Sequence, residues 1–204
     1  MQLLIDYMGS IIIGAALMMV VLNANEMVSE NQSVYNGDML VQEMLVETAH
    51  LLEGEFRNMG LGVPEEATSI LYADTSAIRF LYDIDRNGTP DTITYFAGRP
   101  DQMPGTQNEL DRPLYRRVNA GSPHTVGVIT AFNLRYLTRL AEDIPTPVAP
   151  ARLGEVHSVE ITMEVQNPYA VIRSDGVVQE GQRNVLYSSS LWQQTRLASQ
   201  NSRR

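Results

Sequence analysis

The chain has 204 residues and a net charge of −9, produced by 24 acidic residues against 15 basic residues, all of them arginine. This length fits one domain with appendages or two small domains. Cysteine is absent, which excludes disulfides and thiolate metal sites, so packing must hold the folded part together.

The charge is unevenly distributed along the chain. Residues 1–66 contain ten acids against Arg57 alone, whereas residues 67–204 contain fourteen acids and fourteen arginines. The acidic arm repels polyanions, so we expect no nucleic-acid partner. The arginine-bearing remainder can dock onto acidic surfaces, including the arms of neighbouring copies.

The N-terminal segment is apolar from Leu3 to Leu22, with one carboxylate, Asp6, near its start. About 20 helical residues at ~1.5 Å each span the roughly 30 Å core of a bilayer. Residues 1–25 are therefore predicted to form a single-pass transmembrane anchor. The segment lacks the basic start of a secretory signal, although cleavage near Asn23–Glu26 stays an alternative. The acid-rich flank after Leu22 favours a topology with the N-terminus on the inner side of the membrane and the head on the outer side.

Beyond the anchor, apolar residues recur at spacings of three, four or seven, which predicts that the helix continues over residues 26–62. A helix over residues 2–59 would be about 87 Å long. Gly60–Pro64 forms the stop signal. The apolar stripe comprises Val34, Val41, Leu45, Ala49, Leu52, Phe56 and Met59, and the acids predicted to lie mostly off it are Glu43, Glu47, Glu53 and Glu55.

After Pro64 the pattern changes to the alternation typical of strands. Residues 78–84 and 93–97 are predicted to form a hairpin around a two-residue turn at Asn87-Gly88. This turn would place Tyr82 opposite Ile93 and Phe80 opposite Tyr95, with the aromatic residues on one face.

Further strands are predicted at 114–118, 126–137 and 156–165, the last with one wet face, and weaker candidates lie at 171–178 and 183–192. The proline-rich residues 144–150 are predicted to be an extended surface linker. We therefore predict an α+β fold, in which a long N-terminal transmembrane helix packs on a predominantly antiparallel β-sheet head at residues 63–198. Residues 199–204 are predicted to be a flexible tail.

Asp6 needs a physical explanation, because a carboxylate in hydrocarbon is costly. One interpretation places it at the head-group boundary, solvated and without a role. The other pairs it with the α-ammonium group of Met1 in a neighbouring chain, which would set the stagger of packed helices.

The segment Met1-Gln2-Leu3-Leu4-Ile5-Asp6-Tyr7, followed by an apolar helix, resembles the start of type IV pilins and type II secretion pseudopilins. Leu52–Gly60 is similar to the helix end of W-type minor pilins and J-type pseudopilins. Residues 78–96, 114–117 and 128–136 resemble the first strands of their heads. Here the acid is aspartate in place of the usual glutamate, and it is the sixth residue where the family has it fifth.

This resemblance implies a non-enzymatic structural subunit of a pilus-like or pseudopilus-like filament. Its partners would be other pilin or pseudopilin subunits, and Met1 and Asp6 would be its assembly residues. The alternative is a single-pass, membrane-tethered binding module whose β head recognises a ligand.

The spacing Asp83-x-Asp85-x-Asn87-Gly88-x-x-Asp91 matches the first part of a calcium-binding EF-hand loop. Thr94 stands where the loop needs its bidentate glutamate, and the flanking segments are predicted strands. The calcium site formed by Asp83, Asp85, Asn87 and Asp91 thus competes with a plain acidic turn. We expect no other cofactor, and no enzyme activity, because the three histidines are scattered and neither a nucleophile elbow nor a phosphate loop is present.

Overall fold

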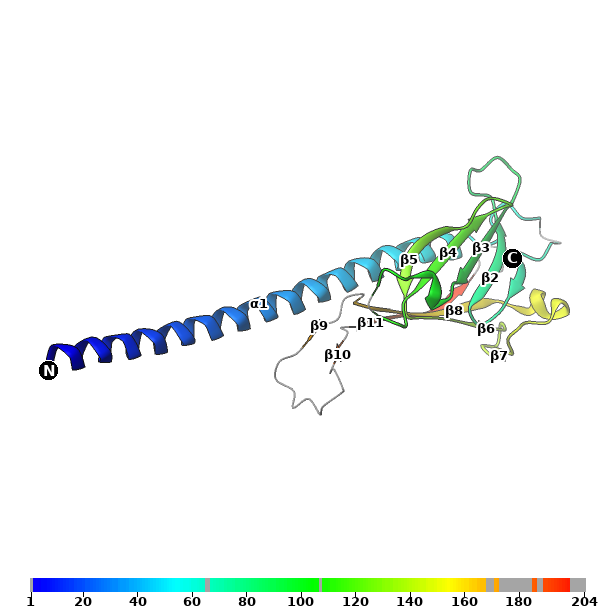
Figure 1. Cartoon of the computed structure of the whole chain (residues 1–204). Coiled ribbons are helices and arrows are strands. Elements are labelled where there is room, and N and C mark those ends of the chain that lie inside the picture. The colour runs from blue at the N-terminus through cyan, green and yellow to red at the C-terminus, as the bar shows by residue number, and fades with distance from the viewer. Residues whose placement is uncertain are drawn as a thin grey trace.

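The computed structural model describes residues 2–64, 67–106, 108–167, 171–172, 185–186 and 189–198. A single long helix, α1 (Gln2–Arg57), precedes a head built of strands (Figure 1), so the predicted α+β class is confirmed. The strands are β1 (Ile70–Ala73), β2 (Ala77–Tyr82), β3 (Asp91–Ala97), β4 (Arg112–Val118), β5 (His124–Ile129), β6 (Ala131–Leu137), β7 (Asp143–Ile144), β8 (Ser158–Gln166), β9 (Val171–Ile172), β10 (Val185–Leu186) and β11 (Ser189–Ala198). Two short 3-10 helices, η1 (Pro100–Gln102) and η2 (Pro150–Glu155), lie in the connections.

The helix α1 has 56 residues, which makes it about 84 Å long. It ends at Arg57, two residues before Met59, the last residue of the predicted stripe, and five before the predicted boundary at residue 62. Gly60 takes a left-handed conformation with φ 81, which glycine adopts without steric cost. The N–H of Gly60 donates to the carbonyl of Leu81 in β2 at 2.8 Å, so the segment that follows α1 is hydrogen-bonded directly to the sheet.

The head contains two antiparallel sheets of four or more strands in the part of the chain that the structure describes. One follows the chain in the order β1-β2-β3-β4-β5, and the other has the order β11-β8-β6-β7. A two-stranded ribbon of β9 and β10 is separate from both. The two larger sheets lie as layers in Figure 1, and α1 runs along β11 and past β5.

One hydrophobic core joins the helix to both sheets. The predicted stripe of α1 is confirmed from Val41 onward, because its members turn toward the strands and are buried. The buried stripe comprises Val41, Leu45, Ala49, Leu52, Phe56 and Met59. The side chain of Val34 lies outside the described residues.

The predicted hairpin exists, but its register was wrong by two residues. Tyr82 pairs with Asp91 and Phe80 with Ile93, so an eight-residue loop joins β2 to β3 in place of a two-residue turn. The loop stays open because carboxylates of its own acidic residues accept its backbone N–H groups, as described below. A shift of two residues keeps every side chain on its face, and Phe80, Tyr82 and Tyr95 are all buried as expected.

The segment predicted as one strand at 126–137 forms two strands in different sheets. Both the N–H and the hydroxyl of Thr130 donate to the carbonyl of Glu164 in β8, at 2.9 and 3.3 Å. These bonds redirect the chain from β5 to β6. The strands at 112–118 and 158–166 confirm the other two firm predictions.

Two predictions of solvent exposure were wrong. In β8, Glu160 is buried, and Arg135 of the neighbouring strand β6 donates to its carboxylate at 3.1 Å. In the proline-rich segment, Ile144 and Val148 are buried, and the N–H of Val148 donates to the carbonyl of Ala73 in β1 at 2.9 Å. The segment is therefore fastened to the head. Of the weaker predicted strands, β9, β10 and β11 cover parts, and the predicted tail at 199–204 lies outside the described residues.

Candidate functional site

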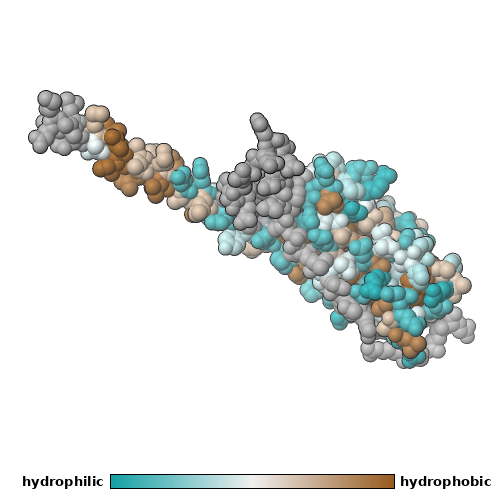
Figure 2. Space-filling model, turned by 90° about the horizontal axis from the view of Figure 1, so that it is seen from below, coloured by the Kyte–Doolittle hydropathy of each residue, from teal (hydrophilic) through white to brown (hydrophobic). Residues whose placement is uncertain are grey.

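The free half of α1 is the first candidate functional feature. Among the described residues, one stretch is long and apolar enough to cross a membrane, namely the 23 residues Tyr7–Ser29. None of its apolar window is buried within the molecule, and Figure 2 shows apolar side chains gathered along this projecting part of the helix. Its exposed large apolar residues include Tyr7, Met8, Ile11, Ile12, Ile13, Leu17, Met18, Met19, Val20, Val21, Leu22, Met27 and Val28.

This stretch overlaps the predicted anchor at residues 1–25 and extends it to Ser29. Each apolar side chain that such a helix leaves in water is unfavourable, so we expect a bilayer or other helices to cover it. Of the two predicted assembly residues, Met1 lies outside the described residues. Asp6 is helical and directly precedes Tyr7, but its side chain is not described. Its pairing with a neighbouring Met1 stays a prediction.

The other half of α1 is fixed in the head by aromatic contacts. The ring of Phe56 lies 5.1 Å from the ring of Phe80 in β2 and 5.7 Å from that of Tyr95 in β3, centroid to centroid. All three side chains are fully buried. Such pairs add stability beyond the area that they bury. The helix therefore carries the head rigidly, and the position of one defines the position of the other.

A buried polar cluster lies beside these rings. The guanidinium of Arg116 in β4 donates from Nε and Nη2 to the carboxylate of Glu55, with the Nη2–Oε1 distance at 2.5 Å. The hydroxyl of Tyr95 donates to Oε2 of the same carboxylate at 2.5 Å. Glu55 thus meets a tyrosine from β3 and an arginine from β4, two neighbouring inner strands of the five-stranded sheet.

The pKa values of the cluster reflect this arrangement. Burial raises the pKa of the Tyr95 hydroxyl well above its ordinary value, and the neighbouring Glu55 carboxylate raises it further. The hydrogen bond to Glu55 raises the pKa of Arg116. The cluster therefore holds one negative and one positive charge next to a neutral phenol at the helix–sheet boundary.

Sequence analysis missed Glu55, which it placed mostly off the apolar stripe. Glu55 follows Leu52 by three residues and so shares part of the buried face of α1. That spacing was a usable signal, but its partner Arg116 lies 61 residues away in the chain. Arg116 reaches Glu55 because β4 pairs with β3, which places Arg116 beside Tyr95 on the face of the sheet that meets α1.

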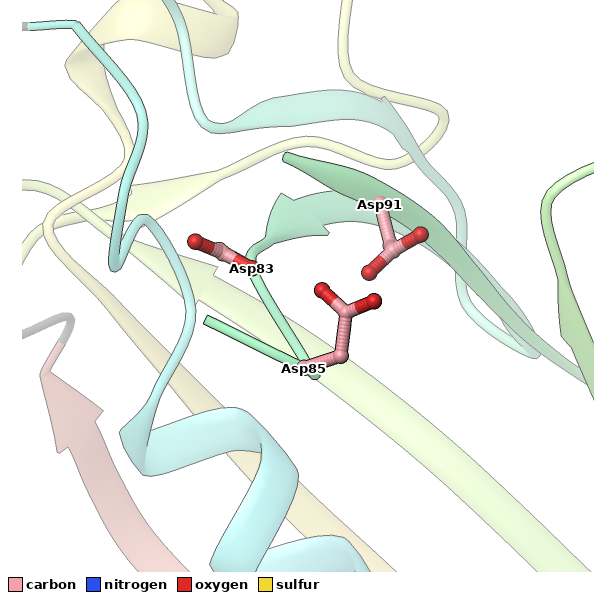
Figure 3. Close-up of side chains that lie close together, drawn as sticks. All are labelled: Asp83, Asp85 and Asp91. Carbon is pink, nitrogen blue, oxygen red and sulfur yellow. The ribbon is translucent and has the colours of Figure 1, made fainter. Parts of the chain in front are cut away.

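The second candidate site is the acidic loop between β2 and β3. Asp85 and Asp91 turn their carboxylates toward each other, with Asp83 beside them (Figure 3), and one oxygen from each of the three lies within 4.8 Å of the others. Asp83 is buried, Asp91 is half-buried and Asp85 is exposed. The structure thus brings together the three predicted acids.

Asn87, the fourth predicted ligand, is used differently. Its Oδ1 accepts from the N–H of Thr89 at 2.7 Å, and its Nδ2 donates to Asp85 at 2.9 Å. Thr94, at the position where an EF-hand has its last ligand, lies within β3 and is buried. The loop therefore does not have the course of an EF-hand.

The three carboxylates already close the loop as protein groups. Together they accept six hydrogen bonds from N–H donors. Among them, the N–H groups of Asn87 and Gly88 donate to Asp83 at 3.1 and 2.8 Å. Carboxylate oxygens are the donors that calcium prefers, so the chemistry fits a calcium ion, but the loop has a structural explanation without one. Calcium binding here stays a prediction, which calorimetry of the full chain with calcium would test.

The acidic loop is also connected to the helix exit. The N–H of Asp83 donates to the carbonyl of Leu61 at 2.9 Å. A Cβ placed on Gly62 would lie 2.7 Å from the Cβ of Asp83, and Gly62 has φ +77, so both space and backbone conformation require glycine. The end of α1 thus rests on the loop.

No protein-family model, curated protein or solved structure gives a significant match to the chain. The geometry itself therefore defines the class: an α+β protein with one candidate membrane helix in the described part of the chain and an antiparallel β head.

Proposed function

We propose that the protein is a non-enzymatic structural subunit of a filament of the type IV pilus or type II pseudopilus kind. It would be anchored in the inner membrane by its N-terminal helix, with the N-terminus cytoplasmic and the head periplasmic or extracellular. The apolar halves of neighbouring helices would pack together, and each rigid helix would carry its head to a defined place on the outside.

The observation that supports this proposal is the division of one continuous helix into two halves. The stretch Tyr7–Ser29 has no cover within the molecule, whereas the stripe from Val41 to Phe56 is buried in the head core. A tether for a binding domain needs only to cross the membrane and can be joined flexibly. A rigid helix that enters the core transmits the packing of one end to the arrangement of the other.

The experiment is to recover the full-length protein from membranes and examine it by electron microscopy and sedimentation as detergent is removed. Filaments or regular oligomers support the proposal. A protein that stays monomeric in detergent over a wide concentration range contradicts it, and favours the alternative of a membrane-tethered binding module.

Replacing Asp6 by alanine tests the assembly role of this residue separately. If Asp6 pairs with the α-ammonium group of Met1 in a neighbour, Asp6→Ala reduces assembly while leaving membrane insertion intact. Asp6→Glu keeps the charge and is the control. Unchanged assembly of Asp6→Ala would contradict the pairing and leave the head-group interpretation of Asp6.

A further inference from the structure

The outer face of the five-stranded sheet carries two arginines with a threonine between them. Arg79 in β2 pairs with Thr94 in β3, and Thr94 pairs with Arg117 in β4. Residues opposite one another in antiparallel strands point to the same face. Their sequence neighbours Ile78, Phe80 and Tyr95 are buried in the core, so this row faces outward. The two arginine Cα atoms are two strand spacings apart, or about 9.6 Å.

Within the described ranges, neither arginine of this arginine row (Arg79, Thr94, Arg117) is in an ion pair. Asp74, which directly follows β1, accepts from the Tyr72 hydroxyl at 3.0 Å and from the N–H of Thr75 at 2.7 Å.

Two polar atoms of the row have no hydrogen-bond partner among the residues that the structure describes. They are Nε of Arg117 and Oγ1 of Thr94, both buried, and Thr94 as a whole is 6% exposed. A buried donor without an acceptor is costly, so a small rearrangement that brings an anion to this row gains several hydrogen bonds at once.

A matching acidic surface exists on α1. Glu43 and Glu47 are one turn apart, which places their Cβ atoms about 6 Å from each other on one face of the helix. Both are exposed, and they lie on the side away from the stripe that contains Val41, Leu45 and Leu52. In the part of the chain that the structure describes, no ion pair involves either acid.

We propose that the arginine row of one subunit binds the Glu43–Glu47 face of α1 in a second copy of this chain. The inference rests on the proposed function and specifies the contact between heads and helices outside the membrane. Arginine side chains on either side of Thr94 can converge on two carboxylates one turn apart, which gives charge-assisted hydrogen bonds of the bidentate kind.

The acidic face of α1 stands outside the candidate span, beside its own head. Glu43 follows Ser29 by 14 residues, so it stands about 21 Å beyond the end of the candidate span. Leu45 and Ala49, its neighbours on α1, pack into the core of their own head. Subunits standing side by side in one membrane therefore bring the helix of one to the level of the head of the next.

The experiment measures self-association of the full-length protein in detergent micelles by sedimentation, at low and high salt. The head variant Arg79→Glu/Arg117→Glu should weaken association about tenfold, because two attractive pairs become repulsive. The helix variant Glu43→Arg/Glu47→Arg should weaken it similarly, and an equimolar mixture of the two variants should associate like the wild type. High salt should weaken the wild-type association.

The matched control is Arg99→Glu/Arg152→Glu, which changes one exposed and one half-buried arginine elsewhere on the head. The single variant Arg79→Glu, at an exposed position, serves where the half-buried Arg117 does not tolerate glutamate. Circular dichroism checks that each variant is folded.

Association of the wild type that both charge reversals leave unchanged would overturn this inference and leave the proposed function standing. A wild type that does not associate at all would overturn both. If the head variant instead loses binding to anionic lipid vesicles while self-association persists, the row is a membrane-facing surface and the inference is wrong.

Discussion

The carboxylate of Glu55 and the guanidinium of Arg116 meet at the boundary between α1 and the five-stranded sheet, 2.5 Å apart at their closest atoms. The two residues are 61 positions apart in the chain, and both side chains are largely removed from solvent, with 10% and 21% of their surfaces exposed. The bond joins the helix to the head at one defined height. Its loss therefore affects both the stability of the head and the direction in which the helix leaves it.

Replacing Arg116 by methionine should lower the free energy of unfolding by about 3 kcal/mol, because it leaves the Glu55 carboxylate buried without its cation. Unfolding of the full-length protein in micelles can be followed by the fluorescence of Trp192, the single tryptophan, which packs against the core.

The control for this prediction is Arg99→Met. Arg99 pairs with Asp101 on the surface at 3.2 Å, with both side chains mostly exposed, so its loss should change stability by less than about 1 kcal/mol. The double variant Glu55→Gln/Arg116→Met removes both charges and keeps an acceptor for Tyr95. It should recover much of the loss, and a double variant no more stable than Arg116→Met would contradict the assignment of the cost to an unpaired buried charge.

Alkaline pH should destabilise the protein steeply. Burial raises the pKa of the hydroxyls of Tyr95 and Tyr136 well above the ordinary value of 10. Above about pH 10 the unfolded chain loses these two protons while the folded protein keeps them. The free energy of unfolding therefore falls as the pH rises, by about 1.4 kcal/mol per pH unit for each tyrosine.

Tyrosinate absorbance and Trp192 fluorescence, recorded together from about pH 9 upward, check this expectation. Two of the nine tyrosines should ionise only as the protein unfolds. Tyr95→Phe should reduce the steepness of the transition. Ionisation of all nine tyrosines in a protein that is still folded would show that Tyr95 and Tyr136 are not protected.

The predictable part of the fold is the part that local periodicity determines. The stripe from Val41 to Phe56 repeats every three or four residues, and each of its members is buried. The faces of β2 and β3 were predicted correctly for the same reason, since alternation alone assigns them.

The rest depends on contacts between distant segments. The predicted register of β2 and β3 was wrong because the Asp83 carboxylate accepts hydrogen bonds from the N–H groups of Asn87 and Gly88, which hold the loop open. The buried role of Glu55 depends on Arg116, which only strand pairing brings near. The break between β5 and β6 at Thr130 depends on the carbonyl of Glu164 in β8, 34 residues further along the chain. No local pattern contains these partners.

Asp111 is a buried carboxylate that should cost stability at neutral pH. It is 1% exposed, and neither of its side-chain oxygens makes a hydrogen bond of normal geometry among the described residues, although the nearby Thr106 hydroxyl offsets part of the effect of burial on its pKa. Burial raises its pKa above the ordinary value of 3.8. The folded protein therefore binds this proton more tightly than the unfolded chain does, and stability from this group falls as pH rises from about 4 through the folded pKa.

Asp111→Asn should raise the free energy of unfolding at pH 7 by about 1 kcal/mol, and this gain should shrink as the pH falls from 7 toward 4 and the native carboxyl takes up its proton. Denaturant unfolding of both proteins across this pH range measures the difference. The surface variant Asp101→Asn should show no such trend. A loss of stability at pH 7 in Asp111→Asn would mean that the carboxylate is stabilising there.

Gly127 in β5 should be intolerant of any side chain, because α1 passes it at close range. A Cβ built on Gly127 would lie 2.5 Å from Oγ1 of Thr48, a buried residue of the helix, whose hydroxyl donates to the carbonyl of Val126 at 3.5 Å. Gly127→Ala should therefore displace the helix and lower the free energy of unfolding by about 2 kcal/mol.

The double variant Thr48→Ala/Gly127→Ala removes the clashing hydroxyl and methyl groups and should regain part of the loss, whereas Thr48→Ala alone should cost about 1 kcal/mol. Gly105→Ala, at a glycine whose added Cβ meets nothing within 4 Å, is the matched control. Denaturant unfolding of the wild type, the two single variants and the double variant gives the coupling between positions 48 and 127. Purely additive effects would mean that Gly127 does not set the distance between α1 and β5. A double variant less destabilised than the sum of the two single variants would identify this contact as one that fixes how the helix, and with it the candidate membrane span, is seated on the head.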